Sequence, residues 1–409
     1  MCSSFKLWTL FFIGLFFFIS SKSSAGEAED EQMKELKEWI RQKRLVTIKE
    51  LGGELAISGE TRVEGQWISE KKAGIKQRGS HAATSKPEYG WDVEVNLMFD
   101  YRTENTWTSI KLEFDNDLGI SSGSVDHLNL ERAYLGGRII ERDTFTFDAE
   151  IGRRPMNNVF DSDIEFNSRL DGAVFKFNKA FEPIGNMYFN IAPFIVDDHI
   201  DHYGVVGELG LLGIAHTGFY VKYSLIDWKK HYANEVRNLF YNYLNSQGML
   251  GYQYVIAPWN KLVDFYAAVL CNHLAKKLPL THHKRMNWAG YVGVDIGQIR
   301  KKGDWAVLLT FQYVEPQAIP DFDASGIKRG NAAGVGLYTT DIKNSEGTAT
   351  TRANAVGSCN YKGFVLDLLY GITNNLTLYQ SLEMSQNIKK TLGPLIYYKK
   401  YELELIYTF

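Results

Sequence analysis

The sequence has little of what would divide it into domains or anchor it as a helical bundle. Its 409 residues include only 9 prolines, and its 36 glycines are spread along the chain rather than gathered into a linker. Three cysteines are too few for a disulfide scaffold. After residue 25, no apolar run approaches the roughly 20 residues that a membrane-spanning helix needs. We therefore expect one continuous unit, which either crosses a membrane as a β-barrel or does not cross one.

The N-terminus has the parts of a secretory signal peptide. Lys6 precedes an apolar run from Leu7 to Ile19, and a polar stretch ending in Ser-Ser-Ala supplies the small residues that a signal peptidase recognises. The sequence predicts cleavage after residue 25, which changes the formal net charge from −3 to −5. That balance is too mild to indicate a nucleic-acid partner. Cys271 and Cys359 remain after cleavage, and whether they pair is left open.

Residues 26–50 show a different pattern from the rest of the chain. Met33, Leu36, Trp39 and Ile40 recur at helical spacing with charged residues between them. This spacing predicts a short amphipathic helix on the periplasmic side. Two interpretations stay open, a frayed lead-in to the next segment or a small oligomerisation or plug element, because so short a helix is marginal alone.

The last eleven residues, 399–409, alternate between apolar and polar side chains. One face holds Tyr401, Leu403, Leu405, Tyr407 and Phe409, and the other holds Lys400, Glu402, Glu404 and Thr408. A period of two is typical of a strand with one apolar and one polar face. Aromatic residues at both ends of the apolar face are typical of a strand that crosses a membrane. An edge strand of a soluble β protein is the alternative.

Two segments near the start of the unit show the same alternation, one beginning at Gly52 and one spanning Tyr89–Arg102. Their polar faces predict side chains that line a wet lumen. The predicted pore-lining residues are Glu60, Arg62, Glu94, Asp100 and Arg102. The predicted lipid-facing residues are Leu55, Val63, Val95 and Leu97.

Together with these two, fourteen further segments read as strands, which makes sixteen, although fourteen or eighteen stay open. They are expected at about 106–115, 128–139, 145–153, 170–178, 187–196, 204–213, 218–228, 248–257, 262–274, 287–299, 304–314, 360–372, 375–387 and 397–409. Short and long connections alternate between them, and an even number of strands brings Phe409 back to the side where the first strand begins. This pattern predicts an all-β fold over 51–409, an antiparallel transmembrane β-barrel with short periplasmic turns and long outside loops.

At this point the chain resembles the porin family of Gram-negative outer-membrane β-barrels. Four stretches show the resemblance: Gly53–Trp67 as an opening strand, Glu150–Asp161 as a strand leading into an Arg-bearing loop, Gly303–Ala324 as a late strand with its loop, and the closing Phe409. The resemblance covers most of 50–409. The chain departs from it at 325–359, a loop longer and poorer in Asp and Gly than the family pattern.

The resemblance implies a constriction inside the barrel. In sixteen-stranded porins, the loop after the fifth strand folds inward and narrows the pore, and residues 153–169 occupy that place. The candidate constriction residues are Arg153, Arg154, Asp161, Asp163 and Glu165. We expect the inward-pointing arginine, which strand parity indicates is Arg154, to face the three carboxylates and create a transverse field. An ordinary exposed loop is the alternative.

The resemblance also implies a location, partners and a function. It implies a bacterial outer-membrane protein in contact with outer-membrane lipids, inserted by the barrel assembly machinery through Phe409 and passing small polar solutes or ions, with a homotrimer as one assembly open to it. The sequence contains no G-x-S-x-G or H-E-x-x-H motif and no histidine spacing typical of a metal site. We therefore expect a passive channel without catalysis, cofactor or resident metal. The alternatives are a plugged structural or receptor barrel and a membrane-embedded hydrolase.

Overall fold

The computed structural model describes fifteen stretches of the chain. They are 46–50, 53–84, 86–117, 127–155, 159–166, 169–197, 202–230, 243–257, 259–277, 281–320, 323–328, 340–343, 349–353, 358–388 and 392–409. The predicted signal peptide and most of the predicted helix over 26–50 lie outside these residues. The last part of that range, Val46–Glu50, is a strand, β1, rather than the end of a helix.

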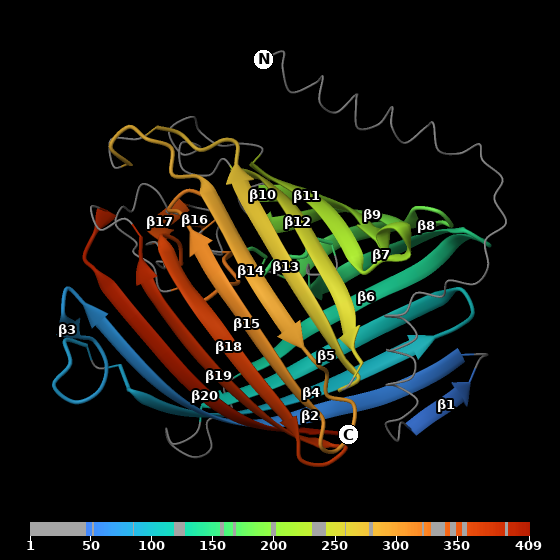
Figure 1. Cartoon of the computed structure of the whole chain (residues 1–409), viewed down its shortest axis with the longest axis horizontal. Helices are drawn as coiled ribbons and strands as arrows, with labels where there is room; N and C mark the ends of the chain where they lie inside the picture. Colours follow the sequence, from blue (N-terminus) through green and yellow to red (C-terminus); the bar gives the residue numbers. More distant parts are fainter. Residues whose placement is uncertain are drawn as a thin grey trace.

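In the described residues, sixteen antiparallel strands form one closed barrel (Figure 1). They are β2 (Gly53–Lys72), β4 (Tyr89–Arg102), β5 (Thr106–Asp117), β6 (His127–Arg142), β7 (Phe145–Pro155), β8 (Arg169–Phe181), β9 (Gly185–Asp197), β10 (His202–Leu212), β11 (Phe219–Lys230), β12 (Tyr243–Ile256), β13 (Lys261–Asn272), β14 (Trp288–Ile296), β15 (Trp305–Val314), β18 (Tyr361–Gly371), β19 (Leu376–Asn387) and β20 (Ile396–Thr408). The predicted fold and strand number are confirmed.

Shorter elements extend this barrel. Strand β3 (Ile75–Lys76) pairs with the far end of β2, and β16 (Thr340–Lys343) pairs with β17 (Ala349–Ala353) as a separate hairpin. A single turn of 3₁₀-helix, Ile214–His216, connects β10 to β11. No helix in the described ranges is both long and apolar enough to span a membrane.

The barrel closes where the first long strand meets the last. Strand β2 pairs with β4 on one side and, from Glu60 to Lys72, with β20 on the other. At the end of this seam, the Phe409 N–H donates to the Gly59 carbonyl at 2.9 Å, and the Gly59 N–H donates to the Phe409 carbonyl at 3.0 Å. Beyond that point, β1 takes the place of β20 beside Gly53–Ile57. Phe409 therefore lies at the end of the barrel where β2 begins, as the even strand number predicts (Figure 1).

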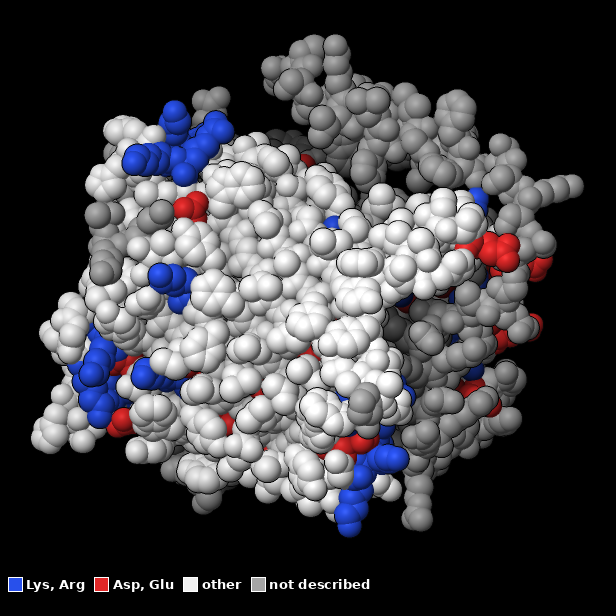
Figure 2. Space-filling model, viewed as in Figure 1, with Lys and Arg blue, Asp and Glu red and all other residues white. Residues whose placement is uncertain are grey.

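The faces of the strands are inverted relative to a soluble protein. On β20, Leu405 is 44% exposed on the outside, whereas its neighbour Glu404 is 7% exposed on the inside. Tyr401, Leu403 and Tyr407 share the outward face. In Figure 2, the middle of the visible outer surface has few charged residues, and most of them gather at its margins. Such a surface is what hydrocarbon requires of a barrel exterior.

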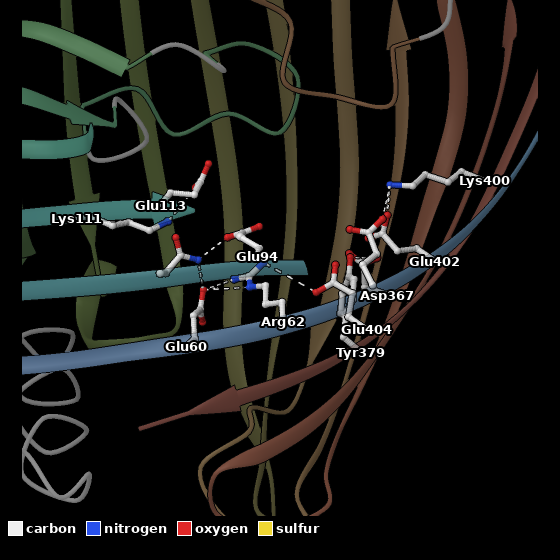
Figure 3. A network of polar contacts seen from close by, with 12 residues as sticks. Glu60, Arg62, Glu94, Lys111, Glu113, Asp367, Tyr379, Lys400, Glu402 and Glu404 are labelled. Atoms are coloured by element: carbon white, nitrogen blue, oxygen red, sulfur yellow. Dashed lines mark hydrogen bonds and ion pairs between the residues drawn. The ribbon is translucent and has the colours of Figure 1, made fainter. Parts of the chain in front are cut away.

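The first two predicted strands show the same inversion. Val63 is exposed on the outside, while on the inside Arg62 contacts Glu60 and interacts with the charge of Glu94 (Figure 3). Strand β2 continues five residues past the predicted end at Trp67, as far as Lys72. The alternation of polarity is lost after Trp67, so the sequence pattern could not show this extension. Cys271 and Cys359 are both thiols, and no disulfide joins them.

Replacing Val95 with Arg should destabilise the barrel strongly. Val95 lies on the outward face of β4, directly opposite the exposed Phe114 of β5. A charge placed in hydrocarbon near the bilayer midplane costs about 2–4 kcal/mol of unfolding free energy. The measurement is equilibrium unfolding in lipid vesicles. The matched control is Glu94→Gln, one residue away on the inward face, which should cost far less. Equal losses in the two variants would contradict the assignment of the faces.

Candidate functional site

The connection between β7 and β8 folds into the barrel, as expected for the loop after the fifth strand. Its described part, residues 159–166, is named here the inner loop. Val159, Phe160 and Ile164 are fully buried within it. Phe166 stacks on Trp228 of β11, with ring centroids 5.4 Å apart, and meets the edge of Phe194 of β9 at 5.9 Å. Apolar packing against two wall strands therefore anchors this loop inside an otherwise polar lumen.

Asp161 fixes the inner loop through polar contacts to four strands. Its backbone N–H donates to Glu208 of β10 at 2.9 Å, and its carboxylate pairs with Lys222 of β11 at 2.5 Å. Its carbonyl accepts from Gln247 of β12 at 2.5 Å and from Tyr291 of β14 at 3.4 Å. These contacts hold the Asp161 carboxylate at a defined place in the lumen, where it stays partly exposed.

A second segment enters the lumen after β15 and joins the inner loop. We name residues 315–320 and 323–328 the second segment. The Phe166 N–H donates to the Asp323 carbonyl at 3.1 Å, and the Ser325 N–H donates to the Ile164 carbonyl at 3.0 Å, on either side of a bridge between Glu165 and Ala324. The strands expected at 304–314 and 360–372 leave residues 315–359 as a long outside connection, and this part of it instead packs against the inner loop within the barrel. The only sequence signal was the apolar pair Ala318 and Ile319, which is fully buried.

One side chain on the barrel wall supports both pieces. Gln312 of β15 donates to the Asp163 carbonyl of the inner loop at 3.3 Å. Its side-chain oxygen accepts the Ile327 N–H of the second segment at 3.0 Å and the Tyr361 hydroxyl of β18 at 2.9 Å. A glutamine suits this place because its amide both donates and accepts.

The two predicted arginines have partners other than the inner-loop carboxylates. Arg154 is 3% exposed in its side chain; it pairs with Glu150 and lies over the Tyr134 ring, 5.0 Å from its centroid. Arg153 lies on the opposite face of β7 and forms two 2.7 Å contacts with Asp171 of β8. Strand parity therefore puts Arg154 inward, but the structure does not bring it together with Asp161, Asp163 or Glu165.

The predicted pore-lining residues lie on the other side of the lumen. Arg62 contacts Glu60 at 2.7 Å, and the amide of Asn96 donates to Glu60 at 2.9 Å and also contacts Glu94 (Figure 3). Asp100 shares this face of β4 and lies closer to the end of the barrel where β2 begins. Arg102 lies over the Trp107 ring, 5.9 Å from its centroid. In the ring of strands, β11 behind the inner loop lies eight strands from β2 in either direction. The two walls therefore face each other.

The inner-loop carboxylates differ in burial, and burial shifts the pKa values of two of them. Burial, together with the neighbouring Asp161 and Asp295 carboxylates, raises the pKa of Asp163 to about 7. Burial also raises the pKa of Glu165 well above its usual value, with Asp323 contributing. Asn245 and Trp228 donate to one Glu165 oxygen, and the other oxygen has no hydrogen-bond partner in the described ranges. Burial therefore favours the protonated form of Glu165, and the charge on Asp163 changes with pH near 7.

Comparison with known proteins gives a likeness of fold. No family model matches the sequence, and no curated protein matches it. OprB of Pseudomonas putida, in its high-pH structure, superposes with a TM-score of 0.53 at 9% identity, over 87% of this chain and 94% of that one. The fold is that of a bacterial porin. OmpF of Salmonella typhi, solved in a complex with daunomycin, has a TM-score of 0.51 at 12% identity, over 89% of this chain and all of that one.

Raising the pH through 7 should strengthen a preference of the porin-type lumen for cations. The Asp163 carboxyl ionises as the pH rises through about 7, so the inner loop gains negative charge. Reversal potentials in a KCl gradient across a planar bilayer measure this change. It should shrink with rising salt, because screening limits an exposed charge to about 10 Å at 0.1 M.

Two variants separate the residues of the inner loop. Asp163→Asn should remove the pH response near 7. Glu165→Gln should leave the response in place, because the Glu165 side chain is fully buried away from the open lumen. A pH response of normal size in Asp163→Asn would show that this carboxyl does not face the permeation path.

Proposed function

We propose that the chain is an outer-membrane porin, a passive diffusion channel for small polar solutes or ions. The observation that carries the proposal is the inverted barrel with a loop packed inside it. Its apolar exterior suits hydrocarbon, its polar interior suits water, and the inner loop narrows the passage between them. The likeness of fold to OprB and OmpF supports the same function. Transport through such a lumen needs no catalysed step.

One observation favours a second candidate, a plugged barrel that presents loops to partners. Two pieces of chain, the inner loop and the second segment, pack together inside the lumen rather than one. If they fill it, solutes cannot pass. However, Glu60, Arg62 and Glu94 line the far wall as a charged network, and a wall in dry contact with a plug would be expected to be apolar there. We therefore place the channel first.

The proposal extends to the route of assembly. A signal peptide over 1–25 would direct the chain across the inner membrane, and the barrel assembly machinery would recognise the C-terminal strand. A homotrimer in contact with outer-membrane lipids is the assembly we propose by analogy with the porin fold.

Deleting Phe409 should leave secretion intact and block insertion. The deletion removes the reciprocal 2.9 and 3.0 Å hydrogen bonds with Gly59 that end the closing seam. Unpaired backbone groups at a seam are costly in hydrocarbon. The measurement is the heat-modifiable, folded fraction in outer-membrane preparations. The matched control is Phe409→Tyr, which keeps the backbone and the aromatic ring. Folded protein at normal levels in the deletion would refute this role of Phe409.

Electrical conductance in a planar lipid bilayer tests the function itself. The purified, folded protein should produce stepwise, long-lived currents whose size rises with KCl concentration, because a water-filled lumen conducts in proportion to its ions. A version with the second segment, 315–328, shortened should conduct more than the wild type, because one of the two obstructions is gone. Silence of both proteins would favour a barrel without a channel. Silence of the wild type alone would favour the plugged barrel.

A further inference from the structure

The lumen wall opposite the inner loop gathers carboxylates on neighbouring strands. Glu404 of β20 lies directly opposite Glu64 of β2, and Glu64 lies directly opposite Asp92 of β4. One carboxylate oxygen from each of Glu64, Glu402 and Glu404 lies within 4.8 Å of the others. We name Glu64, Asp92, Glu402 and Glu404 the acidic cluster. Like charges directly opposite each other in a sheet are destabilising, so this arrangement calls for a compensating charge.

Within the acidic cluster, Glu404 has a carboxylate oxygen that accepts no hydrogen bond in the described residues. The residue is 7% exposed, and its Oε2 atom is buried without a hydrogen-bond partner in the described part of the chain. The nearest cation, Arg62, lies 3.9 Å away and directs its hydrogen bonds to Glu60 instead. A buried carboxylate oxygen without a donor is unfavourable, so this atom is available to a ligand that offers positive charge.

The basic residues nearby do not balance the acidic cluster. Lys400 pairs with Glu402 and lies 4.0 Å from Glu64, and Arg62 is the other neighbouring cation (Figure 3). Further carboxylates adjoin the same group. Glu60 and Glu94 interact with Arg62, and Asp115 interacts with Asp92. This wall therefore has more acidic than basic side chains around Glu64, whose side chain is partly exposed.

We propose that the acidic cluster is a binding site for a small divalent cation of the calcium type. Calcium takes oxygen ligands at about 2.3–2.6 Å, so ligand atoms on opposite sides of one ion are about 5 Å apart. The 4.8 Å limit that encloses the Glu64, Glu402 and Glu404 oxygens fits one such ion. Its positive charge would also offset the repulsion among the opposed Glu404, Glu64 and Asp92 carboxylates. The inference rests on the proposed channel for access, because the cation reaches the site through the lumen.

Isothermal titration calorimetry of the folded protein in detergent, with CaCl₂ as the probe, tests the site. The wild type should bind Ca²⁺ with a dissociation constant of roughly 10⁻⁴–10⁻³ M, the range of sites that work at extracellular concentrations. The double variant Glu64→Gln/Glu404→Gln should bind at least about tenfold more weakly, because ligand charge sets the affinity of such sites. Both substitutions keep the side-chain shape and relieve repulsion, so the variant should fold.

Two further variants make the result specific. Asp100→Asn removes one charge from the same face of β4, eight residues from Asp92, and should leave Ca²⁺ affinity unchanged. Lys400→Gln removes the competing ammonium group and should tighten binding, a gain that a purely structural role would not produce. Equal affinity in the wild type and the double variant would overturn the proposal, as would a loss of equal size in Asp100→Asn.

The failure of this inference can be told from the failure of the proposed function. Calorimetry reads binding without any current. Protein that conducts ions but binds no Ca²⁺ overturns the cation site alone. Protein that binds Ca²⁺ at the acidic cluster but carries no current overturns the channel and leaves the site standing.

Discussion

Backbone hydrogen bonding in a medium without water is the constraint on which this architecture depends. An open sheet edge in hydrocarbon leaves N–H and C=O groups unpaired, so only a closed ring of strands can present an apolar surface to lipid. The seam between β2 and β20 provides that closure, from Glu60 to Lys72. Once the ring is closed, side chains alone decide polarity. The inversion seen at Glu404 and Leu405 can then run around the whole barrel.

The interior contains two environments that the strands alone would not produce. Around Glu60, Arg62 and Glu94, the wall is a network of charges suited to water. Around Phe166, Phe194 and Trp228, the wall is a small apolar core into which the inner loop packs. Burial in that second environment raises the pKa values of Asp163 and Glu165. The same residue type thus lines the lumen in a charged network on one wall and packs in a buried environment on the other.

Much of the barrel could be predicted from the sequence, because lipid outside and water inside impose a period of two that a single chain displays directly. Leu405 and Glu404, or Val63 and Arg62, are assigned to opposite faces by position alone. Where both faces meet water, as at the end of β2 beyond Trp67, the alternation and the prediction end together. The prediction that the loop after β7 folds inward rested on the family resemblance, because the composition of the loop did not indicate it.

The partners of individual charges could not be predicted, because they depend on register between strands distant in sequence. Arg154 was expected to face the loop carboxylates, but it pairs with Glu150 and packs over the Tyr134 ring within the wall. The second segment was missed for a related reason. Ala318 and Ile319 are ordinary loop residues until they are buried in one apolar cluster with residues of the inner loop. The acidic cluster likewise exists only where β20, β2 and β4 meet, at the two ends of the sequence.

The junction between the inner loop and the second segment also has a mechanical consequence. The inner loop leaves the ring at β7, the second segment leaves it at β15, and backbone hydrogen bonds between Phe166 and Asp323 and between Ser325 and Ile164 fasten them together. The inner loop and the second segment therefore form an internal link between distant strands of the barrel. A barrel with such an internal link should resist flattening under lateral pressure from the bilayer. We therefore expect the width of the barrel to be held by this internal link as well as by its strand number.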